Sequence, residues 1–288
     1  MVETHYKIKN APRIALLADL HGRDPEPVIS SIQRHDLDLI AIAGDVIYGT
    51  QPEDDISPLD TQENVLPFLS SCASIAPTYL SLGNHEWMAT ETDLERIRST
   101  GVVILDNEFI TTEIKTSDQR FVSIAGLTSA YVTDYRRFRD GLKAAQGASD
   151  EPLPLYPKRD AIGKPEGVES PRSSLERVPE ISWLTGFAAN RSANTYRICI
   201  SHHPEYINLI PHDVDLILSG HTHGGQWRYY SIFKHEWNGV WAPGQGWLPR
   251  YSKGVYDNRL VVSAGLSNTT WVPRICNPTE VVYINCSN

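Results

Sequence analysis

The 288-residue chain has no excess of basic residues. It carries 26 Lys and Arg against 35 Asp and Glu, which gives a net charge of -9. A protein that binds a nucleic-acid backbone usually offers a basic surface to it. The charge balance therefore disfavours a polymeric nucleic acid as a partner. Any attraction for phosphate must be local, most simply through bound cations.

Long hydrophobic runs are also missing. The longest, such as 14–18 and 39–43, are far shorter than the roughly 20 residues that a membrane helix needs. Residues 1–7 show neither the charged and apolar regions of a secretory signal nor paired arginines. We therefore expect a soluble, cytoplasmic protein without a transmembrane segment.

Cysteine is scarce, and no Cys-x-x-Cys pair occurs. Scattered cysteines without an export signal are typical of free thiols in a reducing compartment. Their spacing also argues against a structural zinc site built from thiolates. The four positions are Cys72, Cys199, Cys276 and Cys286.

What the chain does contain is a series of short runs rich in Ile, Leu and Val, each followed by Gly, Asp or His. Such runs are typical of buried strands. Helical spacing occurs between the first three, at 27–32 and 65–72, and again at 93–97. Alternating strands and helices predict an α/β fold with a largely parallel core. The predicted strands are 13–18, 38–43, 77–82, 121–125, 196–201 and 214–219.

Three stretches depart from this alternation. The runs 102–105, 109–114 and 121–125 follow one another closely, which predicts an antiparallel meander. Segment 133–177 is polar, rich in Pro, Gly, Asp and Ser, and without periodicity, so it predicts a long insertion, either a lid or a surface loop. Helical spacing returns at 181–187. The C-terminal end is predicted to be all β, with strands at 240–241, 253–256, 260–264 and 281–284.

Five polar motifs follow predicted strands, and they contain six of the ten histidines. Loops beyond the carboxyl ends of parallel strands meet in one crevice, so these side chains should lie close together. Carboxylate, amide and imidazole ligands suit Mn, Fe or Zn. Any one motif alone could be a helix cap, a turn or a surface histidine. The motifs are Asp19-x-His21, Gly44-Asp45, Gly83-Asn84-His85-Glu86, His202-His203-Pro204 and Gly220-His221-x-His223.

The order of these motifs resembles the calcineurin-like metallophosphoesterase superfamily, over roughly 12–130 and 180–285. Amidohydrolases and metallo-β-lactamases also have His-x-His, but they place it after an early strand. The tail, with Gly224-Gly225-Gln226 and Gly265-Leu266-Ser267-Asn268, is similar to the bacterial branch of predicted phosphohydrolases. The resemblance implies one domain over 1–288, folded as a four-layer α/β/β/α sandwich with two divalent metal ions at its centre.

The resemblance also implies roles for individual residues. Two ions can share and acidify a hydroxide that attacks phosphorus. His85, next to a ligand, would protonate the leaving oxygen or stabilise the transition state. By the same resemblance the ions would be held by Asp19, His21 and His223 on one side, by Asn84, His202 and His221 on the other, and by a bridging Asp45.

Several assignments stay open. The spacing His-x-Pro favours His202 over His203 as the ligand, and Glu86 is more typical of a residue that orients a ligand. Arg23, His203 and Gln226 are weak candidates for substrate contacts.

Tryptophans are dense from Trp227 to Trp271, with Trp237, Trp241 and Trp247 between them. They either pack the β-rich end, which we favour, or form an apolar rim beside the metals together with Tyr229 or Tyr251.

The expected function is a phosphodiesterase or pyrophosphohydrolase acting on a small phosphorylated metabolite or lipid head group. The alternatives are a non-catalytic metal-binding scaffold of the same fold and a nuclease.

Overall fold

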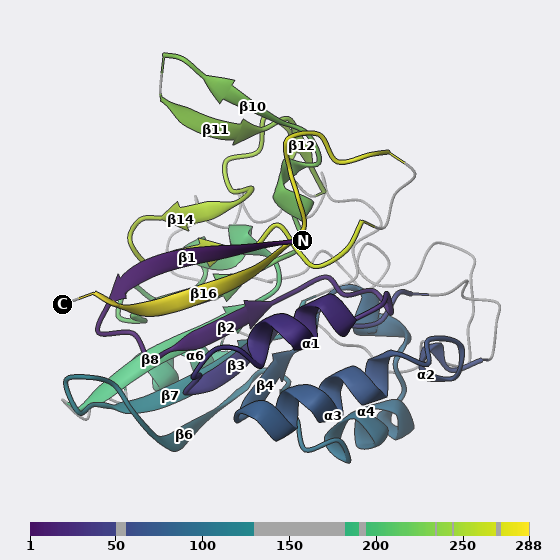
Figure 1. Ribbon diagram of the computed structural model, residues 1–288. Helices are drawn as coiled ribbons and strands as arrows, with labels where there is room; N and C mark the ends of the chain where they lie inside the picture. The colour runs from purple at the N-terminus through teal and green to yellow at the C-terminus, as the bar shows by residue number, and fades with distance from the viewer. Residues whose placement is uncertain are drawn as a thin grey trace.

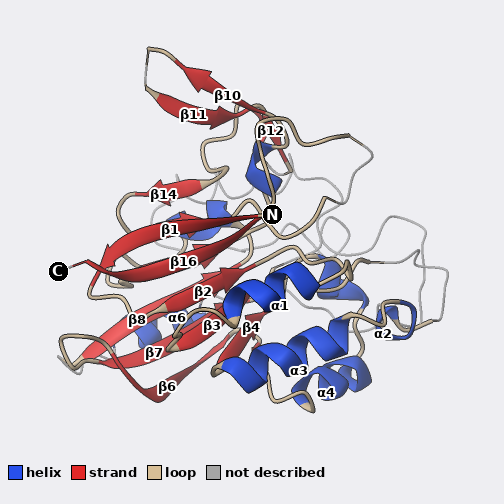
Figure 2. Ribbon diagram, in the orientation of Figure 1, coloured by secondary structure: helices blue, strands red, loops and turns tan. Residues whose placement is uncertain are grey.

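The computed structural model describes residues 1–49, 56–129, 182–189, 194–233, 235–243, 245–268 and 272–287. The described part contains two six-stranded sheets with helices on their outer faces (Figures 1 and 2). The expected insertion at 133–177 lies outside the described residues, as does Trp271. None of the helices in these ranges has the length and apolar content needed to cross a bilayer.

The first sheet has the strand order β1-β16-β2-β3-β4-β5. Four neighbouring strands run parallel: β2 (Ile14–Leu17), β3 (Leu39–Ala43), β4 (Thr78–Ser81) and β5 (Val103–Leu105). The last strand, β16 (Glu280–Ser287), is antiparallel to β2 and parallel to β1 (Val2–Lys9). Every residue of β2, β3 and β4 is buried, because layers cover both faces of a parallel sheet.

The second sheet has the order β14-β15-β9-β8-β7-β6. Its central strands are parallel: β7 (Phe121–Leu127), β8 (Thr195–Ser201), β9 (Leu216–Ser219) and β15 (Leu260–Val262). The two edge strands, β6 (Glu108–Lys115) and β14 (Gly254–Tyr256), are antiparallel to their neighbours.

Three apolar clusters separate four layers. Side chains such as Leu16, Ile124 and Ile200 fill the space between the two sheets. On the outer face of the first sheet pack α1 (Glu26–Ile32), α3 (Val65–Ile75) and α4 (Glu91–Arg98), and α2 (Pro58–Thr61) adds Leu59 to this layer. On the outer face of the second sheet lie α6 (Ser182–Ala189) and the 3-10 turn η4 (Pro204–Asn208). The four-layer α/β/β/α sandwich is therefore confirmed.

The predicted meander at 102–125 is wrong in part. β6 and β7 pair as expected, but β5 belongs to the first sheet, beside β4. Closely spaced strands do not reveal whether the chain makes a hairpin or crosses to another sheet. Here the turn at Asn107, with a φ of 57°, joins the two sheets. The edge strand β1 was not predicted. In the structure its side chains alternate between more and less exposed positions.

Two short ribbons follow β9. One is the hairpin of β10 (Arg228–Ser231) and β11 (Glu236–Gly239), which projects from the body in Figure 1. The other pairs β12 (Trp241–Ala242) with β13 (Gly246–Trp247). The interpretation of the tryptophans as core packing is wrong for four of them. Trp227, Trp237, Trp241 and Trp247 are 39–73% exposed.

Candidate metal centre

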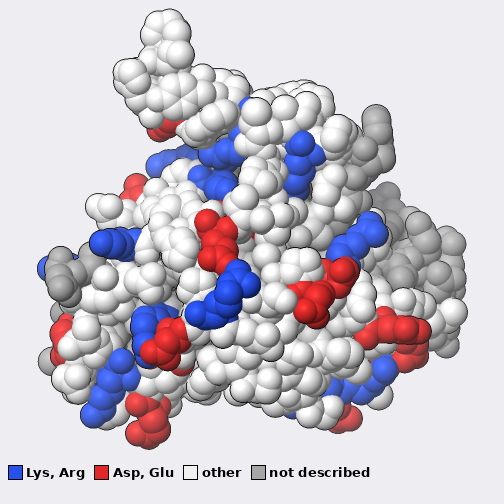
Figure 3. All heavy atoms as spheres, viewed as in Figure 1, with Lys and Arg blue, Asp and Glu red and all other residues white. Residues whose placement is uncertain are grey.

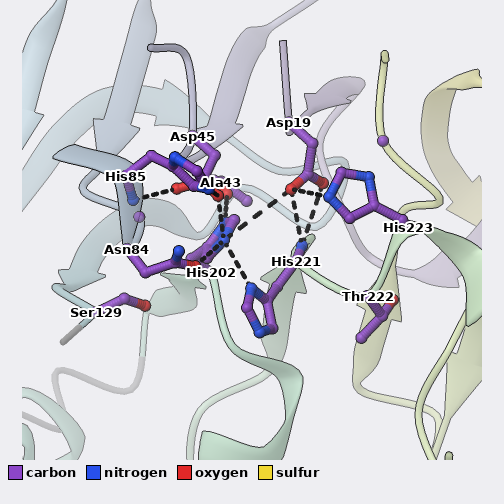
Figure 4. Close-up of polar contacts among 12 residues, drawn as sticks. Asp19, Ala43, Asp45, Asn84, His85, Ser129, His202, His221, Thr222 and His223 are labelled. Carbon is purple, nitrogen blue, oxygen red and sulfur yellow. Dashed lines mark hydrogen bonds and ion pairs between the residues drawn. The ribbon is translucent and has the colours of Figure 1, made fainter. Parts of the chain in front are cut away.

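The five motifs meet between the two sheets, at the carboxyl ends of their strands (Figure 4). Asp19, Asp45 and Asn84 follow β2, β3 and β4 of the first sheet. His202 follows β8 of the second sheet, and His221 and His223 follow β9. Three groups of possible ligands result, each with its atoms within 4.8 Å of one another: Asp19, His21 and His223; His21, Asp45 and His85; and Asp45, His202 and His221.

The backbone is left-handed at most of these positions. Asp19, His21, Asp45, His221 and His223 have φ values between 47° and 69°. Residues other than glycine adopt this conformation only occasionally, at a cost of about 1–3 kcal/mol each, and such residues cluster at functional sites. At each of these positions the left-handed backbone ends the extended course of the strand, and the side chain lies in the crevice.

Two glycines allow the loops to approach closely. A Cβ atom on Gly83 would lie 2.2 Å from Oδ1 of Asp45, and one on Gly220 would lie 2.8 Å from Oδ2 of Asp19. Because neither distance is possible for a real Cβ, any side chain at these positions would displace a carboxylate.

The tightest group surrounds Nε2 of His202. Its other nitrogen, Nδ1, lies 2.6 Å from the carbonyl oxygen of Ala43 and donates to it. When the ring is deprotonated, Nε2 therefore carries a lone pair. It faces Oδ1 of Asn84 at 3.1 Å, Nδ1 of His221 at 3.2 Å and Oδ2 of Asp45 at 3.0 Å. Atoms of three side chains thus surround Nε2 of His202, a position that either a proton or a metal cation can occupy.

The pKa values of His202 and Asp45 also indicate that positive charge is required between these side chains. Burial lowers the pKa of His202, but the charges of Asp45 and Asp19 and the hydrogen bond to Asp45 raise it to about 10. Burial also raises the pKa of Asp45, yet His202 and His85 bring it well below its usual value. The His202 ring is therefore positively charged and the Asp45 carboxylate negatively charged near neutral pH. A bound cation would supply the same positive charge as the proton on His202.

The second group contains Asp19, His21 and His223. Nε2 of His21 lies 3.8 Å from Oδ1 of Asp19, and Nε2 of His223 lies 3.9 Å from the same oxygen. Burial lowers the pKa of His21 well below its usual value, so its ring is neutral. Both of its ring nitrogens are buried without a hydrogen-bond partner among the described residues. Buried polar atoms are rarely left so, and a metal ion fits the lone pair of the inward nitrogen.

Asp19 is held in this group from two sides. Its carboxylate accepts from the backbone N–H of His221 at 3.1 and 3.2 Å, and its carbonyl oxygen accepts from Oγ of Ser267 at 2.8 Å. Burial, opposed by His202 and reinforced by Asp45, raises the pKa of Asp19 to about 7. A cation beside this carboxylate would lower that pKa again.

His223 has an unexpected neighbour. Nη2 of Arg274 lies 3.1 Å from its Nδ1, and a guanidinium can only donate. The neutral ring therefore carries its proton at Nε2, towards Asp19. Burial and the Arg274 charge lower the pKa of His223 to about 3. Metal binding through Nε2 requires the opposite tautomer, so Arg274 would have to release Nδ1 first.

His85 lies at the edge of the cluster, where its side chain is 25% exposed. Its Nδ1 accepts a hydrogen bond of 2.8 Å from the backbone N–H of Gly49. Burial lowers its pKa, so the ring is neutral and carries its proton at Nε2, which lies 4.0 Å from Oδ2 of Asp45. The ring of Tyr48 stacks on it, with centroids 5.1 Å apart. This tautomer makes Nε2 a hydrogen-bond donor and not a metal ligand.

Glu86 holds the loop that carries Asp45. It is fully buried, and its two oxygens accept hydrogen bonds from the backbone N–H groups of Asp45, Gly83, Val46 and Ile47 at 2.6–3.3 Å. The expected role of Glu86, orienting a ligand, stays a prediction, and its printed contacts go to backbone N–H groups instead of to an imidazole.

Of the remaining candidates, His203 packs against the ligand cluster, with its ring centroid 4.0 Å from that of His221. Nδ1 of His203 faces Oγ of Ser129 at 2.7 Å, while His202 points inward as its spacing predicts. The Gln226 amide donates to the Val272 carbonyl oxygen at 2.5 Å, and Arg23 is exposed. The contacts of Tyr48, Gly49, Ser129 and Arg274 were not predicted; backbone donors and partners distant in sequence leave no local motif.

Comparisons with known proteins agree with this geometry. The family profile described as calcineurin-like phosphoesterase matches residues 12–225. The chain is 26% identical over 295 residues to an uncharacterized metallophosphoesterase of Campylobacter jejuni. That match covers 96% of this chain, which spans about 60% of the length of the relative.

Solved structures match more distantly. A Thermus thermophilus protein, TT1561, is 13% identical with a TM-score of 0.41, over 78% of this chain and 87% of that one. The sulfate thiohydrolase SoxB of the same organism, in complex with glycerol, is 12% identical with a TM-score of 0.41, over 76% and 49% of the two chains. Since the family profile covers most of the chain, including every motif of the site, the chain belongs to the calcineurin-like metallophosphoesterase family.

Proposed function

We propose that the protein is a phosphoester hydrolase that depends on two divalent metal ions. The observation that carries this proposal is the convergence of side chains from three motifs on Nε2 of His202, with Asp45, Asn84 and His221 at 3.0–3.2 Å from it. The proposed ligands are Asp19, His21 and His223 for one ion, Asn84, His202 and His221 for the other, and Asp45 between them.

Asp45 supports a pair of ions over a single one. Its Oδ2 lies 3.0 Å from Nε2 of His202 and 3.9 Å from Nε2 of His21, so one carboxylate reaches both groups of ligands. The mixture of carboxylate, amide and imidazole favours Mn, Fe or Zn. When bound, two such ions supply Lewis acidity towards a phosphoryl group and lower the pKa of water.

His85 is the proposed proton donor. Its Nε2–H is fixed by the Gly49 N–H on the other nitrogen, and the side chain is exposed enough for a substrate to reach it. A hydrogen bond from Nε2 to the leaving oxygen stabilises the negative charge that develops as the ester bond breaks. Tyr48 keeps the ring in place and offers an aromatic face beside the leaving group.

We infer a phosphodiesterase or pyrophosphohydrolase that acts on a small phosphorylated metabolite or lipid head group. The net charge of -9 leaves no general basic surface for a nucleic-acid polymer. We also propose a cytoplasmic location, since none of the four cysteines, all described, forms a disulfide.

Metal analysis and a substrate panel test the proposal together. The panel compares phosphomonoesters, cyclic nucleotides, nucleotide-sugar pyrophosphates and glycerophosphodiesters. Asp45→Asn should lose metal and activity. His85→Ala should keep its metal and lose about 10²–10⁴-fold in kcat. His212→Ala, an exposed histidine outside the cluster, is the matched control. A metal-loaded protein that hydrolyses no ester at any pH would indicate a non-catalytic scaffold instead.

A further inference from the structure

Large apolar side chains are exposed on the two ribbons that follow β9. At the turn of the β10–β11 hairpin, Ile232 is 68% and Phe233 91% exposed. On the second ribbon, Trp247 is 73% and Leu248 67% exposed. In Figure 3 the hairpin stands out from the body, and most of its visible surface is uncharged. Leu248 lines the same groove as Trp237 of the hairpin, and contiguous exposed apolar surface commonly marks a binding site.

Positive charge lies directly beneath this apolar surface. A groove of about 540 Å³ runs along the base of the hairpin, and its lining includes Arg228, Arg250 and Lys253 against a single acid, Glu236. Figure 3 shows basic side chains gathered below the hairpin.

Of the two arginines, Arg250 is the more accessible, while Arg228 is partly buried. Arg228 donates to the oxygens of Gly224, Ser252 and Trp237, all of them neutral. Arg250 is exposed and lies over the ring of Tyr251 at 5.1 Å. Lys253, in contrast, is paired with Glu280. The groove therefore offers two guanidinium groups to an anion.

The spacing between the apolar and basic groups matches a bilayer surface. Arg228 pairs with Gly239 at the base of the hairpin, and Ser231 pairs with Glu236 near its turn. Three residues of strand span roughly 10 Å. Interfacial segments bury their apolar face about 5–10 Å deep, at the boundary of headgroups and acyl chains. With Phe233 at that boundary, the guanidinium group of Arg228 would lie among the headgroup phosphates.

We propose that the two ribbons dock the protein on an anionic lipid bilayer. Ile232, Phe233 and Trp247 enter the interface, and Arg228 and Arg250 bind headgroup phosphates. Bilayer interfaces accept tryptophan and tyrosine rings well, and anionic lipids attract cations at about 1 kcal/mol each. An anionic bilayer offers both an apolar layer for the exposed side chains of the ribbons and phosphates for the basic groove.

Docking would bring the metal centre close to the membrane. The turn η5 (His223–Gly225) begins at the metal-ligand candidate His223, and β10 starts three residues after that turn ends. Gly225 and Gly239 pack so closely that a Cβ on Gly225 would lie 2.5 Å from the Cα of Gly239. The hairpin base is thus tied to the centre. Membrane docking does not require catalysis, so its test is independent of the proposed function.

Co-sedimentation with vesicles tests the docking surface. The full chain should bind vesicles of phosphatidylcholine mixed with phosphatidylglycerol, and bind less to phosphatidylcholine alone or at high salt. Phe233→Ser should weaken binding about tenfold or more, from the apolar area it withdraws. Arg250→Gln should weaken it about fivefold.

Two matched variants serve as controls. Val103→Ser changes an exposed apolar residue of β5, the edge strand of the first sheet farthest from β1. Lys115→Gln changes a cation on β6 that also lies over an aromatic ring, that of Phe121 at 4.9 Å. Both should bind vesicles like the parent chain. Since Phe233 is almost fully exposed, Phe233→Ser should unfold at the parent temperature.

Three outcomes would overturn the proposal. The first is a parent chain that does not sediment with anionic vesicles, and the second is a Phe233→Ser variant that binds as well as the parent. The third is a dimer, seen by light scattering and dissociated by Phe233→Ser, without vesicle binding. That last result would assign the apolar surface to contacts between copies of the chain.

Discussion

Glu86→Gln preserves the size of a fully buried side chain but replaces one hydrogen-bond acceptor oxygen by an NH2 donor. The carboxylate accepts from the N–H groups of Asp45 and Gly83 on one oxygen and of Val46 and Ile47 on the other. Glutamine has one acceptor oxygen and an NH2 group that only donates. Two backbone N–H groups would lose their acceptor. At about 1–3 kcal/mol for each, the free energy of unfolding should fall by about 2–6 kcal/mol.

The same change should loosen the loop that holds Asp45 and weaken metal binding at least about tenfold, as outer contacts of metal ligands commonly do. Isothermal titration with Mn²⁺ measures this, alongside urea unfolding. The matched control is Asp93→Asn, another buried carboxylate, which accepts from Ser57 and Thr90 at the start of α4. It should destabilise the chain without changing metal affinity. Equal metal affinity in the two variants would refute the role assigned to Glu86.

Three other predictions follow from single contacts. Chelation should lower the melting temperature and Mn²⁺ should restore it. A bound ion would supply the partner that the described residues do not offer to either ring nitrogen of His21. An unchanged melting temperature after chelation would contradict a metal centre. Gly83→Ala should abolish metal binding by calorimetry, since its Cβ would collide with Asp45; wild-type affinity would show that the loops can part. Tyr48→Ala should lower kcat by up to about tenfold, which is the contribution of one aromatic pair. Tyr48→Phe keeps the stack on His85 and should retain the parent kcat. Equal kcat values in the two variants would exclude a positioning role for Tyr48.

Sequence reasoning reached the centre of the site because its residues follow buried strands. Asp19, Asp45 and His221 each come directly after an apolar run, and the carboxyl ends of parallel strands share one crevice. The preference for His202 over His203 agrees with the direction in which each ring points.

The features that could not be predicted from the sequence depend on contacts that leave no local sequence pattern. Gly49 acts on His85 through a backbone N–H that every residue except proline possesses. Arg274 reaches His223 across 51 positions. The sheet that β5 joins depends on packing between layers, which the spacing of strands does not encode.

The position of β16 has a consequence for how the protein folds. This strand, at residues 280–287, lies between β1 and β2, and β2 leads directly to Asp19. The first sheet therefore cannot close until the chain has been synthesised through β16. Pairings between such distant segments form slowly, and until then the edge of β2 is open to other strands. Assembly of the metal centre should be a late, cooperative step of folding, completed only when β16 has inserted between β1 and β2.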